Sequence, residues 1–187
     1  TGGSGLSQMQ FSNDNSTWSG WESFAAVKTG YVMAAGGDGA RTVYARVRDN
    51  AGNTSTIASD GITYDHTAPV LTLTGPFQSD GVTGLSATNT GPVVYKVTAT
   101  EDVAFDFTGN LTLMKGSTAD AAYATNITGA RTATITLSSV TGDGTLAVRL
   151  EAGAATDPAL SESPQTATST TVTIDNTRPT IAFSAPS

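Results

Sequence analysis

The chain contains one segment twice, and this repetition limits what it can fold into. Residues 61–70 read GITYDHTAPV and residues 171–180 read TVTIDNTRPT; both contain a β-branched run, then Asp, a polar residue, Thr and a proline. A further β-rich run follows each copy, LTLTGP in one case and IAFSAP in the other. Asp65 and Asp175 are about 110 residues apart, a spacing that fits one all-β domain. The chain is therefore predicted to be a tandem array of β modules.

Hydrophobic and polar residues alternate with a period of two along most of the chain. The clearest runs lie at 42–48, 92–100, 131–138 and 145–151, and such alternation marks antiparallel strands with one face in the core and one in water. Glycine-rich turn segments separate the runs, and no helix longer than a turn or two is predicted. The residues expected to face inward are Val43, Ala45, Val47, Val93, Tyr95, Val97, Leu146, Val148 and Leu150.

Composition narrows the possible partners. The 187 residues are enough for about two domains. A net charge of −7 disfavours binding to nucleic acid or to an anionic membrane surface. The absence of cysteine excludes a disulfide framework and a thiol nucleophile, and it favours a bacterial exported protein. No apolar run approaches 18 residues, so no membrane insertion is predicted in this segment.

Two stretches carry a resemblance to known repeats. Residues 9–55 contain the patterns SNDNSTW, WE, GDGARTVYARVRD and DNAGN, and residues 69–176 contain VVYKVTATEDV, TGDGTLAVRLEAGAATD and VTIDNTRP. They resemble the bacterial Ig-like and fibronectin-III-like tandem repeats of large surface proteins, such as adhesins and S-layer-associated proteins. The resemblance implies an all-β chain of Ig-like antiparallel β-sandwiches in an end-to-end array, on a bacterial cell surface or secreted.

The same comparison predicts the module boundaries. An Ig-like/fibronectin-III-like module is expected at 1–66, without its first two strands by analogy, and a bacterial Ig-like module at 67–176. Residues 177–187 are expected to be the first strand of a following module or a strand donated to a neighbouring copy. Donation of residues 179–186 would join copies head to tail into a filament, whereas an excerpt from a longer chain would explain the same pattern without assembly.

The acidic residues are candidate calcium ligands. Calcium binds about 6–8 oxygen atoms from carboxylates, carbonyls and amides. In a seven-strand sandwich the entering chain, the B–C loop and the F–G loop share one pole. For the second module these segments supply Asp65, Glu101, Asp102 and Asp157. Related repeats bind calcium at module junctions, so the resemblance implies the same site.

Further ligands are expected elsewhere. Asp49 and Asn53 occupy the equivalent F–G loop of the first module, and Asp175 would serve a following module. The alternative interpretation is that these carboxylates and amides cap turns in an acidic protein.

Catalysis is not predicted, because a general base must be held in a site. The only histidine, His66, lies in a linker, and no nucleophile, phosphate-binding or metalloprotease motif is present. Trp18, Trp21 and Tyr31 are candidates for a sugar-binding face, although Ig-like sandwiches often pack a tryptophan against their core.

The leading hypothesis for function is a non-catalytic spacer or stalk of an extracellular bacterial surface protein, as in an adhesin, a surface layer or a filament. Its partners would be neighbouring modules or copies of the same protein. The alternatives are a module that binds a glycan, a protein or a host surface, and an accessory domain of a secreted hydrolase.

Overall fold

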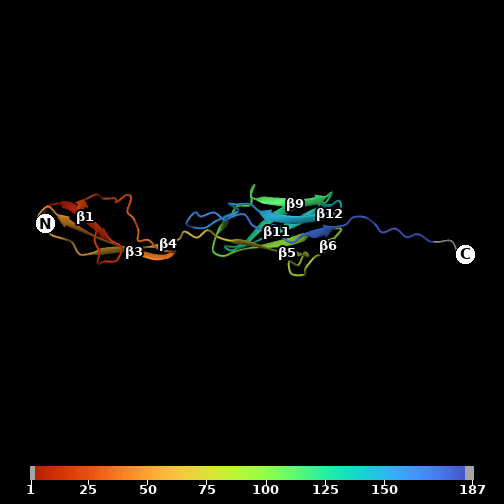
Figure 1. The fold of residues 1–187 in the computed structure, drawn as a ribbon, viewed down its shortest axis with the longest axis horizontal. Coiled ribbons are helices and arrows are strands. Elements are labelled where there is room, and N and C mark those ends of the chain that lie inside the picture. The colour runs from red at the N-terminus through yellow and green to blue at the C-terminus, as the bar shows by residue number, and fades with distance from the viewer. Residues whose placement is uncertain (1–2, 184–187) are drawn as a thin grey trace. The chain divides into compact units, whose positions relative to one another are not determined.

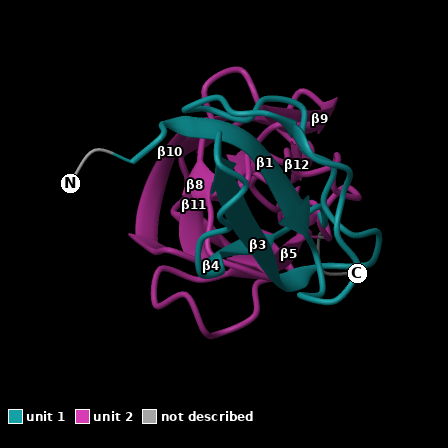
Figure 2. Ribbon diagram, turned by 90° about the vertical axis from the view of Figure 1, so that its left-hand side faces the viewer, with its two compact units in different colours: residues 1–67 teal, residues 68–187 magenta. Residues whose placement is uncertain are grey.

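The computed structural model describes residues 3–183 and is all-β, as predicted. These residues form fourteen strands and no helix; correspondingly, none of them belongs to a helix long and apolar enough to cross a membrane. The chain divides into two compact units, Thr1–Thr67 and Ala68–Ser187, which Figure 2 distinguishes by colour. The sequence placed this boundary one residue earlier and separated the tail from 177 onward, of which residues 184–187 lie outside the described part.

Unit 1 is built from one antiparallel sheet in the order β2-β1-β3-β4. Its strands, seen at the N-terminal side of Figure 1, are β1 (Leu6–Ser12), β2 (Glu22–Ser23), β3 (Gly39–Asp49) and β4 (Ala58–Tyr64). The central pair, β1 and β3, is in register from Gln8 opposite Arg48 to Ser12 opposite Tyr44. The long segments 13–21 and 24–38 form no extended strand in the described chain.

The inward row predicted for unit 1 is only half-buried. Val43, Ala45 and Val47 all keep part of their surface in solvent, and Met9, 6% exposed, is the one apolar residue of the described part of unit 1 that is buried. Partial exposure of this row was expected for a module without its first two strands, whereas the sandwich expected for unit 1 is not seen: its described residues form one sheet. Half-burial is what a single layer covered by irregular loops produces.

Unit 2 is a β-sandwich with two four-stranded sheets, β10-β11-β7-β5 and β6-β14-β12-β9, and a short pair, β13-β8. Pairing is antiparallel except for a two-residue parallel contact between β14 and β6. The strands are β5 (Leu71–Phe77), β6 (Ala87–Thr88), β7 (Val93–Ala99), β8 (Ala104–Phe105), β9 (Leu111–Ser117), β10 (Asp120–Gly129), β11 (Thr132–Thr141), β12 (Gly144–Leu150), β13 (Ala155–Thr156) and β14 (Val172–Ile174).

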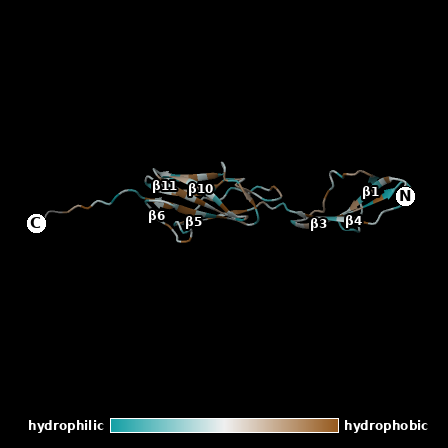
Figure 3. Ribbon diagram, turned by 180° about the vertical axis from the view of Figure 1, so that it is seen from behind, coloured by the Kyte–Doolittle hydropathy of each residue, from teal (hydrophilic) through white to brown (hydrophobic). Residues whose placement is uncertain are grey.

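The predicted core of unit 2 is confirmed. The inward residues expected on β7 and β12 are each 0% exposed, and they pack with inward residues of β11 and β14 in one cluster. Buried and more exposed residues alternate along β11, as period-two patterning requires, and Figure 3 colours the strands by hydropathy. The members of the cluster that are 0% exposed are Val93, Tyr95, Val97, Ile135, Leu137, Leu146, Val148, Leu150, Ala154, Ala155 and Val172.

A Gly-Asp-Gly turn leads into an inner strand of each unit. Gly39, the first residue of β3, and Gly144, the first residue of β12, have the same φ, +137°. A Cβ on Gly144 would lie 2.0 Å from the carbonyl oxygen of Gly116, so only glycine fits at this turn. The turn leaves the aspartate between the two glycines exposed in unit 1, as Asp38, and half-buried in unit 2, as Asp143.

Candidate metal site

The chain enters unit 2 along a course that β-pairing fixes. Leu71 at the start of β5 pairs with Ala99 at the end of β7. One step earlier, Thr100 donates its backbone N–H to the carbonyl of Val70 (3.1 Å), and the Thr100 hydroxyl accepts from the N–H of Val70 (3.0 Å). Pro69 is fully buried. The segment from Asp65 to Pro69 therefore leads past the loop that begins with Glu101.

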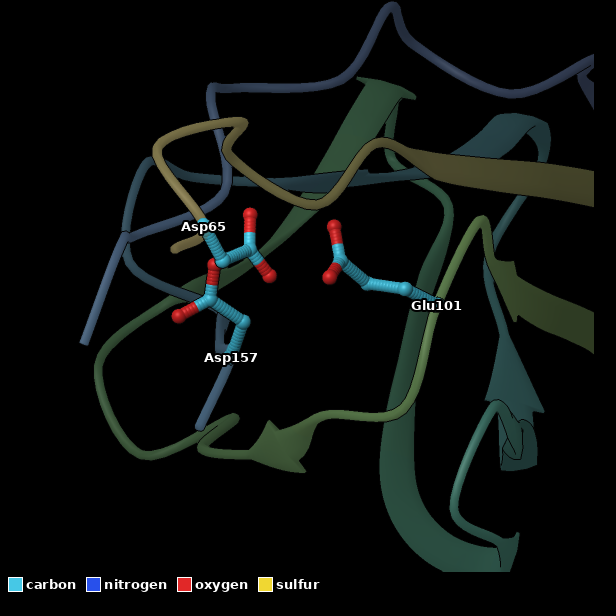
Figure 4. A group of neighbouring side chains, drawn as sticks. All are labelled: Asp65, Glu101 and Asp157. Atoms are coloured by element: carbon cyan, nitrogen blue, oxygen red, sulfur yellow. The ribbon is translucent and has the colours of Figure 1, made fainter. Parts of the chain in front are cut away.

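Three carboxylates come together there. Asp65 precedes β5, Glu101 follows β7, and Asp157 follows β13; a carboxylate oxygen of each lies within 4.8 Å of the others. Figure 4 shows the three side chains pointing toward one another from three separate segments of the chain. Asp65 and Glu101 are half-buried and Asp157 is 3% exposed. These three are part of the set of four residues that the sequence places at this pole together with Asp102.

Asp157 is the most deeply buried of the three and has an unsatisfied oxygen. Its Oδ1 accepts the backbone N–H of Ser161 (2.8 Å), which closes a tight loop, and its backbone N–H donates to the Ser161 carbonyl (3.1 Å). Its Oδ2 is buried and has no hydrogen-bond partner among the described residues. A buried carboxylate oxygen without a donor is costly, because it has lost water and gained nothing in return.

The cluster has the ligand chemistry of a hard divalent cation. Three carboxylates so close together repel one another unless a cation or a proton offsets their charge. The donors are all oxygen, with neither imidazole nor thiolate, which suits calcium or magnesium better than zinc. Because the three ligands come from irregular segments rather than a rigid frame, the looser coordination of calcium fits better than the strict octahedron of magnesium.

Asp102, the fourth residue expected in this set, lies outside the cluster. Its carboxylate Oδ1 accepts from Nε of Arg131 at 2.5 Å, and both side chains are more than half exposed. Arg131 sits in the turn before β11, so the ion pair joins two loops of unit 2. An exposed pair of this kind contributes little to stability.

The other predicted ligands cap their own turns. Asp49 accepts the backbone N–H groups of Ala51 and Asn53 (2.9 Å each) and the side-chain amide of Asn53 (3.0 Å). The Asn53 bonds, first that of its side chain, lower the pKa of Asp49. Asp175 is exposed and accepts the N–H of Thr177 (3.0 Å). The structure thus places Asp49, Asn53 and Asp175 apart from the three-carboxylate cluster.

Two aspartates that the sequence analysis did not single out hold the repeated segments in place. Asp38 accepts the backbone N–H of His66 (2.8 Å) and the hydroxyl of Thr67. Asp143 makes the same pair of contacts with Asn176 and Thr177. The recurring Gly-Asp-Gly triplet before each Asp-x-Thr segment was the sequence signal for this clamp.

The aromatic residues of unit 1 divide between two roles. The rings of Trp18 and Trp21 are covered by guanidinium groups, with Arg46 4.3 Å from the centroid of Trp18 and Arg48 4.4 Å from that of Trp21. These are cation–π contacts within unit 1. Tyr31 instead packs against Phe11, with ring centroids 5.4 Å apart. Trp18 and Tyr31 line one cleft of unit 1, and Trp21 is not among the residues that line it.

Comparisons with known proteins give a limited picture. No protein-family model matches the chain, and no curated protein matches it. Among solved structures, it is similar to one described as fibronectin(III)-like modules of Clostridium thermocellum CbhA. The identity is 11% and the TM-score 0.37, over 98% of this chain and 87% of that one.

Proposed function

We propose that this chain is a non-catalytic structural segment of an extracellular bacterial surface protein, and that a calcium ion held by Asp65, Glu101 and Asp157 ties the linker to unit 2. Its partners are neighbouring modules or copies of the same protein. The repeated linker, the cysteine-free composition rich in Ser and Thr and the sandwich core of unit 2 support the spacer function.

One observation carries the calcium part of the proposal: the buried, unpartnered Oδ2 of Asp157 in a cluster of three carboxylates. An aspartate that only caps a turn needs one or two backbone N–H donors and no neighbouring carboxylate. Asp157 already has its donor on Oδ1, and Asp65 caps its own turn by accepting the backbone N–H of Thr67 (3.2 Å). Turn capping therefore leaves the buried second oxygen of Asp157 unexplained. A divalent cation would supply a partner for that oxygen and offset the charge of the three carboxylates.

The experiment is calorimetric melting of the whole chain in EDTA and in millimolar calcium. Calcium should raise the melting temperature of unit 2 by several degrees, because an ion that binds only the folded state stabilises it by mass action. Asp157→Asn keeps the acceptor for Ser161 and removes one charge. It should abolish the calcium response, and in EDTA it should melt at or above the temperature of the unsubstituted protein because repulsion is relieved.

Asp102→Asn is the matched control, since it removes a neighbouring carboxylate that lies outside the cluster. This variant should respond to calcium as the unsubstituted protein does. The calcium proposal would be rejected if millimolar calcium left the melting of the unsubstituted protein unchanged, or if both asparagine variants lost the response equally.

A further inference from the structure

Unit 1 contains a cleft on its surface, lined by residues at the end of β1 and in the segments that follow it. It has a volume of about 520 Å³, within the usual range of small-ligand sites. It opens where the end of β1 meets the segments 17–22 and 28–32. Aromatic and polar side chains share its walls; those that matter here are Phe11, Trp18, Tyr31, Asn13, Glu22 and Lys28.

The aromatic wall is held rigidly. The Tyr31 hydroxyl donates to Oδ1 of Asn13 (2.8 Å), and Nδ2 of Asn13 donates to the carbonyl of Val32 (3.4 Å). Tyr31 also leans on Phe11 at an interplanar angle of 54°. A ring fixed in this way presents a flat apolar face to a ligand at little cost in conformational entropy.

The polar wall carries unused hydrogen-bonding capacity. Lys28 donates to Oε2 of Glu22 at 2.8 Å, and about a third of each side chain remains exposed. Oε1 of Glu22 is buried and has no hydrogen-bond partner among the described residues. The exposed third of each side chain lies in the lining of the cleft, where the carboxylate and the ammonium can meet neighbouring hydroxyl groups as acceptor and donor.

The electrostatics of the cleft favour a neutral ligand. The charges of Glu22 and Lys28 offset each other. Burial and, second, the negative charge of Asp14 raise the pKa of Tyr31, so the field of a carboxylate reaches the aromatic wall. A ligand that carried its own carboxylate there would meet repulsion.

We propose that this cleft binds a neutral saccharide, with a sugar ring stacked on Tyr31 and its hydroxyl groups bonded to Glu22 and Lys28. The combination of a flat ring and paired polar groups fits a sugar better than a peptide, which would need a deeper apolar pocket or a free strand edge. The proposal is independent of calcium, because the cleft lies wholly in unit 1 and shares no residue with the three-carboxylate cluster.

The test is titration of the whole chain with cellohexaose, maltohexaose and chitohexaose, and with hexagalacturonate as the charged comparison. Binding is followed by isothermal calorimetry and by tryptophan fluorescence, since Trp18 lines the cleft. At least one neutral hexasaccharide should bind with a Kd below about 1 mM, more tightly than hexagalacturonate, and equally in EDTA and in calcium.

Variants locate the binding. Tyr31→Ala and Lys28→Ala should each weaken it at least about tenfold. Tyr31→Phe, which keeps the ring, should weaken it less. Tyr123→Ala, which removes an exposed tyrosine of unit 2, should leave it unchanged. Because Tyr31→Ala also loosens a loop, Lys28→Ala provides the second, independent measurement. The proposal is overturned if no neutral hexasaccharide binds, or if Lys28→Ala and Tyr31→Ala bind as tightly as the unsubstituted chain.

Discussion

Two buried polar side chains of unit 2, Tyr95 and Asp157, differ in whether their polar atoms have hydrogen-bond partners. Tyr95 is 0% exposed, and its hydroxyl is within reach of the carbonyl oxygens of Thr170 (3.2 Å) and Leu146 (3.4 Å). Burial raises its pKa to about 12, so it remains a neutral donor. Asp157 is similarly buried but keeps one oxygen without a donor. A satisfied group stabilises the sandwich, whereas the unsatisfied oxygen of Asp157 is the atom that the proposed calcium ion would bind.

Replacing Tyr95 by phenylalanine tests the structural half of this contrast. Tyr95→Phe keeps the ring in the core and removes the hydrogen bond, so unit 2 should lose roughly 1 kcal/mol of stability. Urea denaturation followed by circular dichroism measures this loss. An unchanged midpoint would show that the hydroxyl makes no effective bond in the folded protein.

Glu151 should make unit 2 sensitive to acid. Hydrogen bonds from Thr112 first, then from Arg149 and Gln165, lower its pKa from 4.5 to about 2. A folded-state pKa below the unfolded one means that the carboxylate stabilises the protein above pH 4.5, and that this stability is lost as the pH falls toward 2. Melting curves of the unsubstituted chain and of Glu151→Gln should therefore converge as the pH falls through this window. A constant difference across it would contradict the assignment.

At the scale of secondary structure, β3 and β12 show what a second sheet contributes. Both follow a Gly-Asp-Gly turn and both carry an alternating hydrophobic row. The row of β12 is fully buried, because β7 and β11 of the facing sheet pack against it. The row of β3 is half-buried. The same alternating pattern should therefore contribute more to the free energy of unfolding in unit 2 than in unit 1.

A pair of matched substitutions measures that weight. Val148→Ala removes two methyl groups from a side chain that is 0% exposed and should cost roughly 2–3 kcal/mol. Val47→Ala makes the same deletion at a half-buried position and should cost less than about 1 kcal/mol. Calorimetric melting of each variant gives both values. Equal losses would mean that the inner face of β3 is covered as completely as that of β12.

The sequence allowed the strands to be predicted better than the burial. Period-two alternation locates β7, β11 and β12, because the alternation lies within a short, continuous stretch of sequence and does not depend on distant residues. It also placed Asp65, Glu101 and Asp157 at one pole, since the order of strands in a sandwich determines which loops meet. The exclusion of Asp102 could not be predicted, because its partner, Arg131, lies 29 residues away and reaches it only through the register of β11. The burial of Asp157 could not be predicted either, because it depends on how the loop around this residue packs.

At the scale of the whole molecule, both units contain the same contact between an aspartate and the segment that follows the last strand. Asp38 grips the segment that follows β4, and Asp143 grips the segment that follows β14, through the same Asp-x-Thr contacts. Each clamp lowers the pKa of its aspartate, through the Thr67 hydroxyl for Asp38 and the Asn176 N–H for Asp143. In each unit an aspartate thus holds the segment that follows the last strand, as the proposed spacer function would require.

The clamps should therefore control local order. Asp38→Ala should speed hydrogen exchange at the backbone amides of His66 and Thr67, because the acceptor of the His66 N–H is lost. The equivalent amides of Asn176 and Thr177 should keep their rates in this variant. Asp143→Ala should give the reverse pattern. Exchange that did not follow the substituted clamp would show that these segments are held by other contacts.

Hydrogen exchange with and without calcium, followed by mass spectrometry on the whole chain, tests the central claim most directly. If one ion joins Asp65, Glu101 and Asp157, calcium should slow exchange together in peptides covering 65–70, 100–104 and 155–163. The loop at 49–53, whose aspartate is already satisfied by its own turn, should be unaffected. Protection of none of the three segments, or of the 49–53 loop instead, would contradict a calcium site at this cluster.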